Sequence, residues 1–212
     1  MTNTKQFLEE AYKNPDAVPW ETKTPPEELI NLIKDGAIKS GKALDIGCGT
    51  GNFAIYLAQN GFDVTGIDIS GNAIRAAQKK AEAAQCNITF LELDSRDVGS
   101  LKDTFDFVLE WGILHFIMPE FREPYIKNVA SKINKGGKYM VLTFNEQSPE
   151  WGGGKYRKGI TGSDVYYSSM EELENLYKPH FKIIEQKIRP TFFKNSGNEH
   201  LENYLLLERD YG

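Results

Sequence analysis

A glycine-rich run near residue 45 constrains the fold of this chain more than any other stretch. Residues 43–52 read ALDIGCGTGN, an acid among apolar residues followed by glycine at three alternate positions. The apolar residues predict the end of a buried strand, and the run from Phe53 to Ala58 predicts a helix directly after it. Glycines let the backbone approach a ligand closely, and a helix N-terminus offers unpaired N–H groups. The stretch therefore predicts a ligand cradle at the carboxyl end of a first parallel strand.

The spacing of the glycines differs from the dinucleotide fingerprint G-x-G-x-x-G. Gly51 comes one position early, and Asn52 stands where the third glycine of that fingerprint belongs. Asp45, two residues before the first glycine, is also foreign to that pattern and can accept hydrogen bonds from a ligand's amino group. These differences disfavour a nucleotide-dependent oxidoreductase, which stays open as an alternative function.

The pattern D-x-G-x-G-x-G from Asp45 to Gly51 resembles the first motif of the class I S-adenosylmethionine (SAM) methyltransferases. In that family the loop wraps the methionine part of SAM, so the resemblance implies SAM as cofactor and S-adenosylhomocysteine (SAH) as product. It also implies an α/β fold with a seven-stranded Rossmann-like sheet, mostly parallel, with a C-terminal antiparallel hairpin and helices on both faces. A SAM-binding module without catalysis remains a second alternative.

Acidic residues also end the second and third predicted strands. Asp68 ends the predicted second strand, residues 62–68, at the same sheet edge as the cradle, where an acid can bind both hydroxyls of a ribose. Asp94 and Ser95 stand where related methyltransferases hold the adenine amino group. The other residues predicted to bind the cofactor are Trp20, Asp45, Gly47, Cys48, Gly49, Gly51, Asn52, Ile69 and Glu110.

The acceptor is expected at the same edge of the sheet. Methyl transfer from a sulfonium is an in-line displacement that needs alignment and exclusion of water. A thiol or metalloid anion needs little further help, whereas an alcohol or phenol needs a base, for which His115 is the candidate. Residues 110–113 lack the Asn/Asp-Pro-Pro-Tyr/Phe segment of many nucleic-acid and protein N-methyltransferases, which disfavours amide or exocyclic-amine acceptors. The predicted acceptor pocket comprises Tyr12, Trp111, His115, Phe144, Trp151 and Tyr156.

Two segments are predicted to cover the site within one domain of residues 1–212. The N-terminal segment, residues 1–24, precedes the first strand and carries Pro19-Trp20 before a Pro-Pro helix start. This arrangement resembles small-molecule methyltransferases of the thiopurine, thiol/halide and tellurite-resistance type, in several of which an N-terminal aromatic closes over SAM. The insert, residues 145–168, is rich in glycine and tyrosine, and loops of this length in compact domains are usually functional or disordered.

Composition and charge favour a small-molecule substrate over nucleic acid or a membrane as partner. The net charge is −5 and no run of Lys or Arg exceeds two residues, which argues against a protein that grips long nucleic acid. No apolar stretch approaches the roughly 18 residues of a membrane span. Cys48 and Cys86 lack metal-ligand spacing, so no metal is expected, and a reducing cytoplasm is the default location. The sequence leaves open whether the protein is a monomer or a homodimer.

Overall fold

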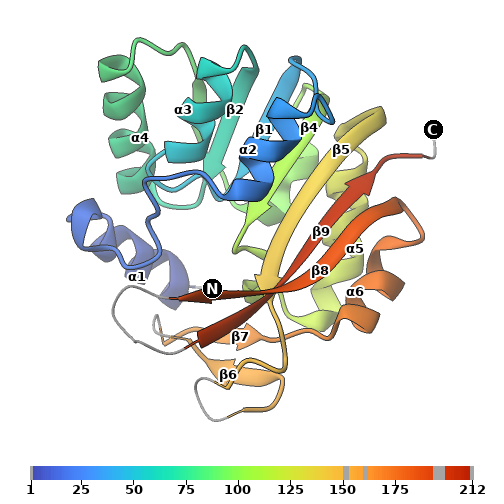
Figure 1. Cartoon of the computed structure of the whole chain (residues 1–212). Helices are drawn as coiled ribbons and strands as arrows, with labels where there is room; N and C mark the ends of the chain where they lie inside the picture. The colour runs from blue at the N-terminus through green and yellow to red at the C-terminus, as the bar shows by residue number, and fades with distance from the viewer. Residues whose placement is uncertain (1, 150–152, 160–161, 193–198, 211–212) are drawn as a thin grey trace.

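The computed structural model describes residues 2–149, 153–159, 162–192 and 199–210. A seven-stranded sheet with the order β3-β2-β1-β4-β5-β9-β8 runs through the molecule (Figure 1). The strands are β1 (Lys42–Ile46), β2 (Asp63–Asp68), β3 (Thr89–Glu92), β4 (Phe105–Trp111), β5 (Ile133–Phe144), β8 (Lys182–Phe192) and β9 (Glu199–Glu208).

The pairing of the strands confirms the predicted architecture. β1 pairs in parallel with β2 and β4, and the parallel pairing continues to β3 on one side and β5 on the other. β9 lies antiparallel between β5 and β8, so the C-terminal hairpin closes one edge of the sheet. Parallel strands need crossover helices, and these helices bury both faces of the sheet.

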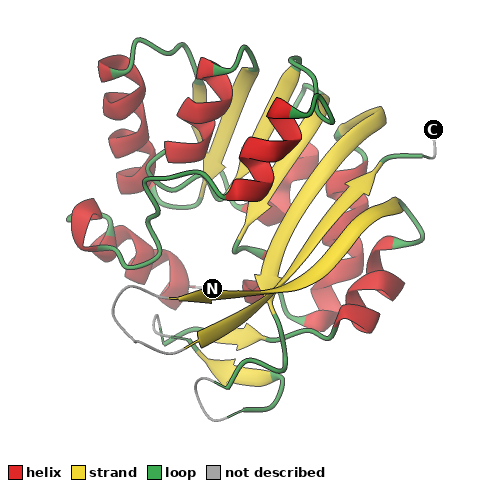
Figure 2. Ribbon diagram, viewed as in Figure 1, coloured by secondary structure: helices red, strands yellow, loops and turns green. Residues whose placement is uncertain are grey.

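Helices cover both faces of the sheet (Figure 2). α2, α3 and α4 pack on one face, where Leu29, Leu57 and Ala77 are fully buried. α5 and α6 pack on the other face, where Ile126 and Leu173 are fully buried. The helices are α1 (Thr2–Ala11), α2 (Glu27–Lys34), α3 (Asn52–Gln59), α4 (Gly71–Ala83), α5 (Pro119–Ala130) and α6 (Met170–Tyr177), with the short 3-10 helices η1 (Pro15–Ala17), η2 (Ser95–Ser100) and η3 (Leu114–Phe116).

The strand order reverses between β1 and β4. The chain runs from β1 to β2 on one side of this point and from β4 to β5 on the other. Ligands of open α/β sheets bind outside the carboxyl ends of the strands at such a point. In Figure 1, α1 and the small hairpin of β6 (Tyr156–Lys158) and β7 (Asp164–Tyr166) lie at this edge. The insert therefore contains a two-stranded sheet of its own.

Candidate active site

The glycine turn joins β1 to α3 at the carboxyl edge of the sheet. The N–H groups of Gly47 and Cys48 both donate to the Ile67 carbonyl, at 2.8 and 2.9 Å, which holds the turn against β2. The φ angles of Gly47, Gly49 and Gly51 are +73°, +52° and +78°. Residues with a Cβ rarely adopt this conformation, so the turn itself requires glycine.

Neighbouring side chains lie directly against two of these glycines. A Cβ added at Gly47 would stand 2.1 Å from Cδ1 of Ile113, and one added at Gly49 would stand 2.3 Å from Oε1 of Glu21. Both distances are shorter than the 3.0 Å that real Cβ atoms keep. At the predicted cradle these two side chains lie directly against the backbone, and a Cβ at either glycine would displace them.

Asp45 is a buried acid beneath this cradle. Asp45 is 1% exposed, its carboxylate accepts a hydrogen bond from the Ala54 N–H, and its Oδ2 has no hydrogen-bond partner among the residues that the structure describes. Burial, with the charge of nearby Asp68, raises the pKa of Asp45 to about 7. An unpaired carboxylate oxygen in this position suits a ligand that brings a hydrogen-bond donor or a positive charge.

The raised pKa of Asp45 makes stability depend on pH. The carboxyl holds its proton to about pH 7 in the folded chain, whereas an aspartate in an unfolded chain ionises near pH 4. Between these values the unfolded chain binds fewer protons, so Asp45 lowers the free energy of unfolding as pH rises. Denaturant unfolding measures this effect as a fall in the free energy of unfolding between pH 4 and pH 8. We expect the fall to be smaller in Asp45→Asn than in the wild type, by at least about 1.4 kcal/mol. The exposed Asp63→Asn serves as control, and equal falls in Asp45→Asn and wild type would contradict the assignment.

Asp68 braces the glycine turn from the end of β2. Its Oδ2 accepts from the Gly49 N–H at 3.0 Å and its Oδ1 from the Ser70 N–H at 2.9 Å. Burial raises the pKa of Asp68 to about 6 although both hydrogen bonds lower it. Ile69 lies between Asp68 and Ser70, whose hydroxyl caps α4. The second predicted acid thus stands beside the cradle.

The third acid, Asp94, stands at the end of β3 beside Asp68. The Leu93 N–H donates to the Asp68 carbonyl at 2.9 Å, which joins the two strand ends. The Asp94 carboxylate caps η2, which begins at Ser95, and forms an ion pair with Arg96. This pairing keeps the pKa of Asp94 below its usual value, despite partial burial. The strand ends therefore bring together the three acids that the sequence analysis singled out.

The N-terminal segment lies across this acidic edge. Buried Tyr12 accepts a hydrogen bond from the indole N–H of Trp20 at 3.0 Å, and its hydroxyl oxygen would stand 3.0 Å from a Cβ at Gly49. Glu9 accepts from the N–H groups of Gly71 and Asn72 at the start of α4, at 2.7 and 3.1 Å. Tyr12, which was predicted to line the acceptor pocket, thus lies beside Gly49 and Trp20, two of the residues predicted to bind the cofactor.

Glu21 is a residue of this site that the sequence analysis missed. Its carboxylate accepts hydrogen bonds from the Thr50 N–H at 3.0 Å, the Thr50 hydroxyl at 2.6 Å and the Asn52 amide at 3.0 Å. The Tyr12 hydroxyl donates to it as well. The available signal was an acid directly after Pro19-Trp20, because the segment was already predicted to close over the cradle.

His115 and Phe144 form a second group at the carboxyl edge. The two rings stack with centroids 3.6 Å apart and planes at 7°, and Tyr167 packs on the other side of the pair, 5.0 Å from Phe144. His115 is 3% exposed, and its Nδ1 has no partner among the described residues. Burial, with the charges of His200 and Arg122, holds the pKa of His115 well below 6.5. The imidazole is therefore neutral near pH 7.

Arg122 of α5 fastens this group to the insert. Its guanidinium donates to the carbonyls of Ile117 and Leu114, at 2.7 and 3.1 Å, which flank His115 in the chain. It also donates to the hydroxyl of Ser168, at 2.7 Å. A buried guanidinium held by carbonyls and a hydroxyl fixes the relative position of η3 and the end of the insert.

Glu110 lies away from the cradle, and one predicted residue lies outside the described residues. The Glu110 side chain is buried on the face of α5, where the hydroxyls of Tyr125 and Tyr139 donate to it, so its predicted cofactor contact is wrong. Trp111 packs edge-on against Phe53 at the start of α3, and Tyr156 is 69% exposed, and their places in the acceptor pocket stay predictions. Trp151 is the residue outside the described ranges.

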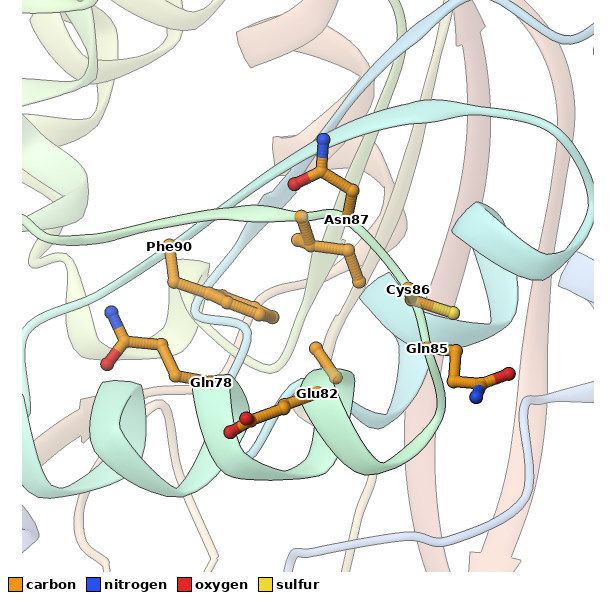
Figure 3. Close-up of a pocket in the computed structure, with 8 residues that line it drawn as sticks. Gln78, Glu82, Gln85, Cys86, Asn87 and Phe90 are labelled. Carbon is orange, nitrogen blue, oxygen red and sulfur yellow. The ribbon is translucent and has the colours of Figure 1, made fainter.

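A separate hollow of about 450 Å³ lies between α4 and the segment leading into β3 (Figure 3). Phe90 forms part of its wall and, on the cradle side, would stand 2.9 Å from a Cβ at Gly51. None of the predicted site residues lines it. Its other lining residues are Gln78, Ala81, Glu82, Gln85, Cys86, Asn87 and Ile88.

The described part of the chain holds neither a membrane-spanning helix nor a metal-binding cluster. No described helix is long and apolar enough to cross a membrane. Within the same residues, no group of three or more His, Cys, Asp or Glu side chains is placed to hold a metal ion.

Comparison with known proteins identifies the family. A model of the methyltransferase domain matches residues 43–137, which run from β1 into β5. The chain is 32% identical, over 117 residues, to an uncharacterized methyltransferase from Schizosaccharomyces pombe; the match covers 55% of this chain and 80% of that protein. The chain belongs to the class I SAM-dependent methyltransferases. This membership sets aside the oxidoreductase alternative.

This methyltransferase is also similar to a second sequence relative and to a solved structure. It is 29% identical over 151 residues to 2-heptyl-1-hydroxyquinolin-4(1H)-one methyltransferase from Mycobacteroides abscessus, across 68% of this chain and 66% of that protein. The structure of magnesium protoporphyrin IX methyltransferase from Synechocystis PCC 6803 with bound SAH superposes with a TM-score of 0.74 at 18% identity, covering 98% of each chain. The second likeness shows the fold alone. SAM is the cofactor of this family and of this methyltransferase.

Proposed function

We propose that this methyltransferase binds SAM in the glycine cradle and transfers its methyl group in line to a small acceptor. The observation that carries the proposal is the unpaired, fully buried Oδ2 of Asp45 beneath a turn with no room for a Cβ. In the proposal Asp45 faces the amino group of SAM, Gly47 and Gly49 pass close to its methionine part, and Asp68 takes the ribose. Asp94 and Ser95 are assigned to the adenine.

The chain's own contribution to the reaction is to position the reactants and exclude water. SAM supplies an electrophilic methyl group on a sulfonium. Tyr12 and Trp20 cover the cradle, and His115 and Phe144 offer an aromatic wall for the acceptor. Aromatic walls with few charges suit a small, partly apolar acceptor and keep water from the sulfonium. We assign residues 1–24 and 145–168 as covers of this one site in a single domain.

The state of His115 favours acceptors that ionise without help. A neutral imidazole whose pKa lies well below 6.5 holds a proton weakly near pH 7. A thiol or a metalloid acid needs little assistance, and we propose that acceptor class. A hydroxylated heteroaromatic is the second candidate, because the relative from Mycobacteroides abscessus is a methyltransferase of 2-heptyl-1-hydroxyquinolin-4(1H)-one.

A panel of thiol, metalloid, phenol and amine acceptors tests this assignment through release of SAH. We expect turnover with thiols or metalloids and little with amines. Because so weak a base gives little assistance, His115→Asn should lower turnover of a phenol and of a thiol by similar factors, both well below the roughly 100-fold of an effective general base. His180→Asn, outside the proposed site, is the control. Faster turnover of amines than of thiols would contradict the proposed acceptor class.

A further inference from the structure

Glu21 brings a third carboxylate to the cradle from outside the sheet. Its Oε1 lies against Gly49, and both oxygens accept hydrogen bonds from the residues that follow in the turn, Thr50 and Asn52. The N-terminal segment therefore closes on the turn through an acid.

The carboxylates Asp45, Asp68 and Glu21 outnumber the cations beside this cradle. Lys80 of α4 donates to Thr50 and Asn52, which in turn donate to Glu21, so one cation stands near one of the three acids. Within the described ranges, no lysine or arginine forms an ion pair with Asp45, Asp68 or Glu21. Carboxylates out of water without a cation are costly, so the arrangement suits a cationic ligand.

We propose that Glu21 makes the closed cradle discriminate SAM from SAH by charge. This inference rests on the proposed binding of SAM at the glycine turn. SAM carries one net positive charge because its sulfonium adds to its ammonium and carboxylate, whereas SAH carries no net charge. Glu21 is partly buried, and a carboxylate partly screened from water attracts a cation more strongly than a fully exposed one. Glu21 therefore favours the substrate over the product without a contact specific to the methyl group.

Calorimetric titration of the full chain with SAM and with SAH measures this discrimination. Glu21→Gln keeps the shape and one acceptor oxygen of the side chain and removes its charge. We expect it to weaken SAM binding about tenfold and SAH binding less than about threefold, so that the ratio of the two affinities falls.

Asn72→Ala is the control, because the Asn72 amide fastens the same segment to the start of α4 through the Glu9 carbonyl, at 2.8 Å, and carries no charge. It should weaken both ligands by the same factor. The wild type gives a second measurement that needs no variant. The SAM analogue with a primary amine in place of the sulfonium keeps the positive charge and should bind more tightly than SAH.

Each result decides between the charge effect and its alternatives. Equal weakening of SAM and SAH in Glu21→Gln would show that Glu21 only fastens the segment, and would overturn the inference. Tighter SAM binding would also overturn it, because Glu21 would then compete with the carboxylate of SAM for Thr50 and Asn52. An amine analogue that binds no better than SAH overturns it as well. A wild type that binds neither SAM nor SAH contradicts the proposed function itself.

Discussion

Gly49→Val should lower SAM affinity by at least about 100-fold, or 2.7 kcal/mol, and leave the sheet folded. The valine side chain would enter the space that Glu21 and the Tyr12 hydroxyl share, 2.3 and 3.0 Å from its Cβ. It would therefore displace the N-terminal segment and fill the part of the cradle assigned to the methionine of SAM. Calorimetric titration with SAM measures the loss, and circular dichroism checks the fold.

Gly36→Val separates this effect from backbone strain. Gly36 also has a positive φ, +67°, but a Cβ there has nothing within 4 Å. Both variants should lose roughly 1–2 kcal/mol of stability because a side chain is strained in the left-handed region. Only Gly49→Val should lose SAM binding. Retained binding in a folded Gly49→Val chain would show that the turn does not approach the cofactor.

The sequence predicted the parts of the site that depend on local chain chemistry. The glycine turn needs positive φ at three alternate residues, so its spacing is visible without the fold. Asp68 and Asp94 each end a strand, and the carboxyl ends of parallel strands meet at one edge.

The errors concern the direction in which side chains point and the contacts between distant segments. Glu110 lies near the carboxyl end of β4, at the edge where the sequence placed it. Side chains alternate between the two faces along a strand, however, and its carboxylate points to the face that α5 covers. Glu21 reaches Thr50 across 29 residues, a contact that no local pattern encodes. Buried Arg122 joins η3 to the end of the insert, and this contact between distant segments is likewise not encoded in a local pattern.

Asp68→Ala should weaken SAM binding by about 10- to 100-fold, since a charge-assisted hydrogen bond contributes roughly 1.5–3 kcal/mol. Asp68 acts twice in this proposal. It would bind the ribose, and it already holds the Gly49 N–H at 3.0 Å, so its removal also loosens the turn. Asp63→Ala, at the exposed amino end of the same strand, should bind SAM as the wild type does.

Comparing SAM with methylthioadenosine, which keeps the ribose but lacks the amino-acid part, separates the two roles of Asp68. If Asp68 binds the ribose, Asp68→Ala should weaken both ligands by similar factors. If Asp68 only braces the turn, methylthioadenosine should keep its affinity while SAM loses it, because only SAM reaches Gly49 with its methionine part. An unchanged affinity for SAM in a folded Asp68→Ala chain would contradict both roles, and would place the cofactor away from the end of β2.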